Sequence, residues 1–453
     1  MPFNYLPLTD PQRREMLGAI GAGSMEDLLI TIPRELRAGK LDVPSGRSEW
    51  EVQQHLAGLA ARNRPLSQQR SFLGAGVSLR YRPAAVDHVA SRSEFFTAYT
   101  PYQPEISQGT LQAIFEFQTL VCELTGMDVS NASMYDGSTA TGEAALMCVR
   151  ATRRRKVLVS GTLHPEYAQV VRTYAWGPGI EIVTVPQRDG GIDLAALDAL
   201  LTGDVAGLIV QVPSAFGGLE PVDEVATRVK AAGALLAVVA DPISLGLLEA
   251  PGRYGADICV GDGQALGNAM SFGGPHVGFM ACKEPLLRQL PGRICGQTAD
   301  SRGNTCYTLT LQTREQHIRR EKAASNICTN QALNALFATL YLGLVGKEGL
   351  REVANVSLQR AHFLAERISQ VPGFAPAFGI AFFNEFVVKT ERPAEEIVRA
   401  LEARGIVAGF PLSRWFPDLA HHLLVSVTEA NSPDDLDAYV EALRSNHLAK
   451  VAV

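Results

Sequence analysis

The residues with the clearest chemical potential form a small set that would hold a phosphate and a flat ring. The segment Asp136–Glu143 (DGSTATGE) opens a predicted helix. Backbone N–H groups, the helix dipole and the hydroxyls of Ser138 and Thr139 would converge there on a phosphate. His164 follows the apolar run Val157–Val159, so its ring would stack on a flat cofactor at a strand end. Each feature alone also fits an ordinary helix cap or an ordinary histidine.

Asp241 ends a further apolar run, Leu235–Ala240. A carboxylate at this place would lie at the carboxyl edge of a parallel sheet, where ligands of α/β proteins bind. Beside a pyridinium nitrogen it would strengthen an electron sink, although strand-ending aspartates also occur in other α/β enzymes. Taken in this order, the three features resemble the phosphate loop, ring-stacking residue and pyridinium partner of fold-type-I pyridoxal-phosphate (PLP) enzymes.

A PLP enzyme of this type needs a lysine just after the following strand, because the Schiff base requires an amine. The segment Ala256–Gly267 contains no lysine, and none occurs between Lys230 and Lys283. Gln264 or Ala265 stands at the expected position. We therefore predict that this chain forms no Schiff base. Its vestigial cofactor pocket would comprise Ser138, Thr139, His164, Asp241, Gln264 and Ala265.

The elements that would position these residues are short apolar runs separated by helical patterns. The predicted strands are Val157–Val159, Ile180–Val185, Gly207–Val212, Leu235–Ala240 and Ile258–Val260. Such runs indicate a parallel sheet buried on both faces, which Val277–Cys282 would join in the antiparallel sense. The predicted fold class is α/β. By its resemblance to aspartate-aminotransferase-like enzymes, the large domain would carry a mainly parallel, seven-stranded sheet beside a small α+β domain.

Three regions are predicted along the chain. Residues 1–90 would form a helical extension, with a loop over Ser67–Arg82, and residues 91–330 the PLP-transferase-like large domain. Residues 331–453 would form the small α+β domain. The expected elements of this last region are the helix Ala332–Leu344 and the strands Phe383–Val388 and Leu423–Val427.

Composition bounds the class of protein. Hydrophobic residues make up 46% and charged residues 19% of the 453, which is typical of a globular protein with a buried core. The net charge of −6 gives no reason to expect nucleic acid or an anionic membrane as a partner. Seven scattered cysteines show no metal-ligand spacing, and no apolar run is long enough to span a membrane. We expect a soluble cytoplasmic protein without a metal.

Longer motifs identify a family. The segments Thr100–Gly109 (TPYQPEISQG), Leu124–Ala132 (LTGMDVSNA) and Phe272–His276 (FGGPH) resemble segments of the glycine cleavage system P-protein. The longest such match is Leu311–Asn330 (LQTREQHIRREKAASNICTN). The resemblance covers nearly the whole chain and corresponds to the half of the P-protein that lacks the lysine. In many bacteria that half is a separate α subunit.

The resemblance implies an oxidoreductase that works only as a complex. PLP would be bound by a lysine-bearing β subunit, within an α2β2 heterotetramer. The complex would decarboxylate glycine, release CO2 and pass the aminomethyl group to the lipoyl arm of the H-protein. Residues of this chain would line one wall of the β active site at the interface between the subunits. The expected wall residues are Tyr99, Tyr102, Glu105, Ser325, Asn326 and Thr329.

Three alternatives stay open at this point. The basic residues of the long motif would either bind an anion or pair with Glu315 and Glu321 on a helix surface. These residues are Arg314, His317, Arg319, Arg320 and Lys322. The chain as a whole would act in catalysis through its wall residues or serve as an inert scaffold for the β subunit. In the third alternative the chain is a stand-alone PLP enzyme, in which Lys283 or Lys322 replaces the missing lysine.

Overall fold

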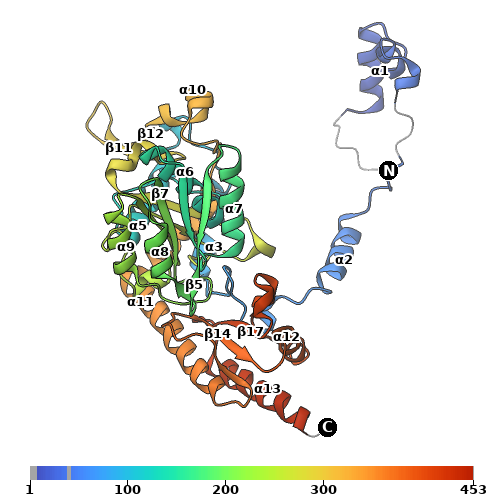
Figure 1. Cartoon of the computed structure of the whole chain (residues 1–453). Helices are drawn as coiled ribbons and strands as arrows, with labels where there is room; N and C mark the ends of the chain where they lie inside the picture. Colours follow the sequence, from blue (N-terminus) through green and yellow to red (C-terminus); the bar gives the residue numbers. More distant parts are fainter. Residues whose placement is uncertain (1–7, 38–41, 452–453) are drawn as a thin grey trace. The chain divides into compact units, whose positions relative to one another are not determined.

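The computed structural model describes residues 8–37 and 42–451, which belong to two compact units (Figure 1). The first unit spans residues 1–68 and contains helices α1 (Asp10–Ala19) and α2 (Glu49–Ala60). Helix α1 begins in a capping box, in which the Thr9 N–H donates to Gln12 Oε1 at 2.8 Å. No residue of either helix is buried, so packing within this unit contributes little to its stability.

The second unit, residues 69–453, is built around a seven-stranded sheet in the order β2-β10-β9-β8-β7-β3-β4. The strands are β2 (Val129–Ser130), β3 (Lys156–Ser160), β4 (Glu181–Val185), β7 (Val205–Val212), β8 (Leu235–Ala240), β9 (Ile258–Asp262) and β10 (Gly278–Cys282). The five strands from β9 to β4 run parallel, while β10 is antiparallel to β9 and to β2. The predicted α/β fold and the antiparallel strand are therefore confirmed.

Helices cover both faces of this sheet, which explains why its strands read as continuous apolar runs. Along β3, Leu158 faces one core while Val157 and Val159 face the other. The first core is filled from α5 (Gln108–Thr125), α8 (Leu194–Leu200), α9 (Val222–Ala231) and the start of α11 (Ala332–Ser369). The second core is filled from α6 (Gly137–Thr152) and α7 (Pro165–Trp176).

A smaller antiparallel sheet, in the order β13-β14-β17-β16, forms a separate core with α12 (Ala394–Glu402) and α13 (Pro433–Val451). Its strands are β13 (Phe374–Pro376), β14 (Glu385–Thr390), β16 (Phe410–Pro411) and β17 (His422–Ser426). Helix α11 links the two sheets and is longer than the predicted Ala332–Leu344. It changes direction at Gly346, whose φ of 58° is open to glycine at little cost.

The predicted loop Ser67–Arg82 begins in a short 3-10 turn, η3 (Leu66–Gln68), and contains one strand. Strand β1 (Arg70–Ser71) pairs in parallel with β15 (Ile406–Val407), beyond which the chain runs without regular structure as far as α3 (Ala84–Ala90). We refer to Phe72–Arg82 as the strap. Among the described helices, none combines the length and apolar character required to cross a membrane.

Candidate functional site

The predicted cofactor residues meet in part at the carboxyl edge of the large sheet. A cavity of about 100 Å³ opens there, and His164, Asp241, Gln264 and Ala265 line it. Ser138 and Thr139 are not among its lining residues. The other lining residues include the strap, Asp262 at the end of β9 and Glu385 at the start of β14. The small sheet and the large sheet therefore share this cavity.

His164 is held in place by hydrogen bonds at both ring nitrogens. It caps α7, because Nδ1 accepts a hydrogen bond from the Glu166 N–H at 3.3 Å. Its Nε2 lies 3.0 Å from the strap carbonyl of Ala75, an arrangement that fits a neutral ring with the proton on Nε2. Burial lowers the pKa of His164, in keeping with this neutral form. The ring also meets Trp415 edge-on, with centroids 4.5 Å apart.

The start of α6, the predicted phosphate site, already holds carboxylates of this chain. Asp136 Oδ1 accepts from the Thr139 N–H at 2.8 Å and from the Ser138 hydroxyl at 2.6 Å. Asp262 Oδ2 accepts from the Gly137 N–H at 3.0 Å. The two carboxylates therefore accept the hydrogen bonds, and interact with the helix dipole, that would otherwise bind a phosphate.

The remaining pocket residues also have partners within the chain. Asp241 Oδ1 accepts from the Ile243 N–H at 2.7 Å, as in a helix cap. Gln264, which is buried, donates from Nε2 to the Asn268 carbonyl at 3.0 Å. Its Oε1 accepts from the N–H of Ser78 in the strap at 3.4 Å.

The strap passes through the pocket and leaves no room for side chains along part of its length. A Cβ at Gly74 would lie 1.8 Å from Glu385 Oε1, and one at Gly76 would lie 3.1 Å from His164 Nε2. The Ala75 N–H donates to Glu385 Oε1 at 2.9 Å. Burial raises the pKa of Glu385 to about 7, and nearby Asp241 adds to the rise. The strap thus contacts the His164 ring at its Nε2 edge.

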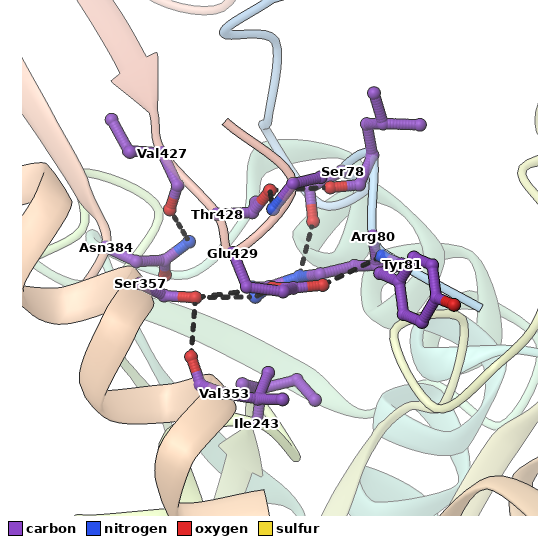
Figure 2. A network of polar contacts seen from close by, with 12 residues as sticks. Ser78, Arg80, Tyr81, Ile243, Val353, Ser357, Asn384, Val427, Thr428 and Glu429 are labelled. Atoms are coloured by element: carbon purple, nitrogen blue, oxygen red, sulfur yellow. Dashed lines mark hydrogen bonds and ion pairs between the residues drawn. The ribbon is translucent and has the colours of Figure 1, made fainter. Parts of the chain in front are cut away.

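The far end of the strap is locked by a buried ion pair, shown in Figure 2. Arg80 Nη1 lies 2.8 Å from Glu429 Oε2, and both side chains are at most a tenth exposed. Ser357 of α11 accepts from the same Arg80 nitrogen at 3.1 Å. The Tyr81 N–H donates to the second Glu429 oxygen at 2.8 Å. This network ties the strap to the long helix and to the segment after β17.

This pocket does not fit PLP. Carboxylates occupy the phosphate site, the strap borders the His164 ring, and no lysine lines the cavity. Lys283 donates to the Gly126 carbonyl at 2.8 Å and lies just after antiparallel β10, on the opposite edge of the sheet. Lys322 is exposed on the long motif. The structure therefore gives neither lysine a place in the pocket.

The predicted wall residues belong to a second, outward-facing region. Tyr99 is 83% exposed and Tyr102 57% exposed, and Glu105 is exposed in a short turn, η4 (Pro104–Ile106). The loop is anchored from below, since Gln108 Nε2 donates to the carbonyls of Pro104 at 2.7 Å and Tyr307 at 2.9 Å. The side chains of Tyr99 and Glu105 thus face solvent while the backbone of the loop is fixed.

The segment Ser325–Asn330, which follows the basic motif, is anchored in a similar way. The Ser325 hydroxyl donates to the buried Glu143 at 2.6 Å, so this residue supports the segment from within. Asn330 Nδ2 donates to the Ser133 hydroxyl at 2.9 Å. Asn326 and Thr329 are exposed.

Arg293 joins these two regions, and the sequence reasoning missed it. Its Nη2 donates to Tyr102 Oη at 3.3 Å and to the Cys328 carbonyl at 2.9 Å. Its Nη1 donates to Asn330 Oδ1 at 3.1 Å. The one signal in the sequence was a charged residue immediately before the apolar pair Ile294 and Cys295 that starts β11 (Ile294–Ala299).

In the basic motif the pairing with glutamates is met at one place among the described residues, where His317 Nδ1 lies 3.9 Å from Glu315 Oε2. Arg314 is buried and donates to the backbone carbonyls of Leu290, Gly292 and Leu311. The helix α10 (Gln316–Arg319) has only four residues, too few for i, i+4 pairs within it. Arg319, Arg320 and Lys322 are exposed.

Comparison with known proteins decides the family. The family model for the glycine cleavage system P-protein matches residues 3–443. This chain belongs to the P-protein family. It is 54% identical over 442 residues to the probable glycine dehydrogenase (decarboxylating) subunit 1 of Carboxydothermus hydrogenoformans, covering 97% of this chain and 99% of that protein. It is 52% identical to the protein of the same name from Moorella thermoacetica, covering 98% and 99%. The relatives' name implies a partner subunit.

Solved structures agree with this family and with the fold. The crystal structure of a glycine decarboxylase (P-protein), in an inhibitor-bound form, is 46% identical and superposes with a TM-score of 0.90. The superposition covers 98% of this chain and 100% of the glycine decarboxylase chain. A bacterial sphingosine-1-phosphate lyase is 13% identical with a TM-score of 0.65, which shows a shared fold only. The predicted large domain of the PLP-transferase type is confirmed.

Proposed function

We propose that this P-protein chain is the subunit without the lysine and that it acts only with a lysine-bearing partner subunit. Together they would decarboxylate glycine and pass the aminomethyl group to the lipoyl arm of the H-protein. The observation that carries the proposal is a pocket whose polar groups are bonded within the chain, in a chain that matches subunit 1 proteins along their whole length. A heterotetramer with two copies of each subunit is the assembly we expect.

PLP would be held by the partner subunit, where it supplies an electron sink for the carbanion left when CO2 departs. This chain would contribute the surface of Tyr99, Tyr102 and Glu105 to the wall of that site. Two hydroxyls and a carboxylate on an anchored backbone suit the orientation of an amine and the exclusion of water. Asn326 and Thr329 would extend the same wall, and Ser325 would support it.

The first test is reconstitution. This chain, the partner subunit and their mixture would be assayed for glycine-dependent exchange of labelled bicarbonate, with PLP and lipoylated H-protein present. We expect exchange from the mixture and none from this chain alone. Exchange by this chain alone would overturn the proposal, because the pocket described above would then have to hold a working cofactor.

A scaffold that only stabilises the partner is the second candidate, and the same pocket favours it to the same degree. The wall residues separate the two candidates. If this chain is a scaffold, Glu105→Gln leaves kcat unchanged in a complex that stays assembled. If the wall takes part in the reaction, kcat falls while the sedimentation coefficient of the complex stays the same.

A further inference from the structure

Arg293 is a buried cation whose hydrogen-bond partners carry no charge. Its side chain is 6% exposed, and its three acceptors are a phenol, a backbone carbonyl and an amide oxygen. A buried guanidinium is usually paired with a carboxylate, because the unpaired charge is expensive to desolvate. What this buried cation does is therefore decided by the groups that it contacts.

The acceptors lie on two segments that are far apart in sequence and close in space. Tyr102 is on the exposed loop, and its ring also lies beneath the guanidinium, 5.6 Å from Arg293 Cζ. Cys328 and Asn330 belong to the segment after the basic motif. The planar guanidinium group carries several donors in fixed directions, so it can donate to all of these partners at once. The ammonium group of a lysine cannot do so.

Arg314 provides a comparison within the same region. It is 8% exposed and also makes three hydrogen bonds, but all of them go to backbone carbonyls of the loop and turn around it. It touches none of the proposed wall residues. Arg314 is thus a structural clamp, whereas Arg293 reaches the side chains of the surface itself.

The backbone of Arg293 is fixed as firmly as its side chain. Its carbonyl accepts from the Ala132 N–H at 2.8 Å, at the start of the segment that leads into α6. Ser133, the next residue, accepts from Asn330 Nδ2 at 2.9 Å. The guanidinium is therefore attached to a fixed backbone. Its orientation determines the positions of the Tyr102 and Asn330 side chains.

We propose that Arg293 is a positioning residue for the reaction, holding the Tyr102 hydroxyl and the Cys328–Asn330 segment in one geometry toward the partner's site. The inference rests on the proposed function, because it gives Tyr102 a role in the wall. It adds a residue that does not itself touch the substrate. Its effect on turnover passes through Tyr102.

The test is a double-mutant cycle in the assembled complex. Arg293→Met, Tyr102→Phe and the double variant would be compared by kcat and KM for glycine in the exchange assay. If Arg293 acts through Tyr102, each single variant lowers kcat/KM about tenfold, and the double variant is about as low as the lower single one. Independent roles would instead multiply to a loss of about a hundredfold, which would overturn the inference.

Arg314→Met is the matched control, since it removes an equally buried guanidinium with equally many hydrogen bonds. Combined with Tyr102→Phe, it should give a product of the two single effects. Coupling of the same size for Arg314 would contradict the inference, because it would reflect general loosening of the region. The sedimentation coefficient and melting temperature of each complex would show that the assembly compared is the same.

Arg293→Lys tests the fork geometry. Lysine keeps the charge but cannot span Tyr102 and Asn330 together, so we expect kcat/KM close to that of Arg293→Met. Full activity of the Arg293→Lys complex would overturn the inference that Arg293 positions these groups. A failed proposed function gives a different result, namely no exchange by the wild-type complex. A Tyr102→Phe complex with full activity would remove the role on which the inference rests.

Discussion

The pocket at the sheet edge and the loop Tyr99–Ile106 use their polar groups in opposite ways. In the pocket, carboxylates, amide and imidazole all have partners inside the chain, and the strap lines one side of the cavity. On the loop the backbone is anchored, while the side chains of Tyr99 and Glu105 face solvent. Both regions carry residues suited to catalysis.

The difference shows that residue type alone does not locate function. A side chain whose hydrogen bonds are all met within the chain stabilises the fold, and it is not free to bind a ligand. In this chain the residues that resemble a cofactor site have become structural. Under the proposed function, the exposed groups of the loop would act only in a complex with a partner subunit.

The largest expected effect comes from breaking the lock of the strap. Arg80→Met leaves Glu429 buried without its cation, so the free energy of unfolding should fall by about 3–5 kcal/mol. Denaturant unfolding of the purified chain measures this loss. Arg82→Met is the control: its ion pair with Asp87 is partly exposed, and the change should stay within about 1 kcal/mol. Equal losses would show that the strap is not locked by the buried pair.

The next effect is a pH dependence that arises within the pocket. Glu385 keeps its proton in the folded chain up to about pH 7, whereas the unfolded chain releases it near the ordinary value of 4.5. Stability from this group is therefore complete below about pH 4.5 and is lost as the pH rises to about 7. The Ala75 N–H, Arg80 and Asp241 face this carboxyl.

Glu385→Gln should remove this contribution, which is on the order of 3–4 kcal/mol at most. The measurement is the free energy of unfolding from pH 4.5 to 8, for the variant and the wild type. The two curves should approach each other at low pH and separate as the pH rises, with the variant more stable. The exposed Glu348→Gln serves as the reference, and a Glu385 variant that follows it across this range would contradict the expectation.

On the loop, the effect should appear in activity and not in stability. Tyr99→Phe and Glu105→Gln change exposed groups, so the free energy of unfolding should move by less than about 0.5 kcal/mol. In the assembled complex, Glu105→Gln should lower kcat at least about tenfold, because the amide cannot accept a proton or balance an ammonium group. Steady-state exchange kinetics give the value, and an unchanged kcat for both variants would favour the scaffold.

The last substitution is expected to have no effect on the binding of PLP by this chain. Gln264→Lys restores an amine near the position of the missing lysine, yet it leaves Asp262 at the start of α6 and the strap against His164. We therefore expect no PLP absorbance band when the variant chain is mixed with PLP. Appearance of a band that borohydride fixes would show that the lysine alone was lacking.

The elements were largely predictable from the sequence because their signals are local. Continuous apolar runs indicated the buried strands, and Val277–Cys282 after a Gly-Gly-Pro turn indicated the antiparallel one. The strap was not predictable, since its path depends on contacts such as Ala75 with Glu385, 310 residues apart. Arg293 was missed for the same reason, as its partners lie on two distant segments.

The most direct test of the account asks which chain carries the cofactor. The active complex would be reduced with borohydride in the presence of PLP, and each chain would then be analysed by mass spectrometry. We predict a phosphopyridoxyl group on a lysine of the partner subunit and none on this chain. A phosphopyridoxyl group on any lysine of this chain, Lys283 and Lys322 included, would contradict the claim that its own pocket does not fit PLP and that it acts only through its surface.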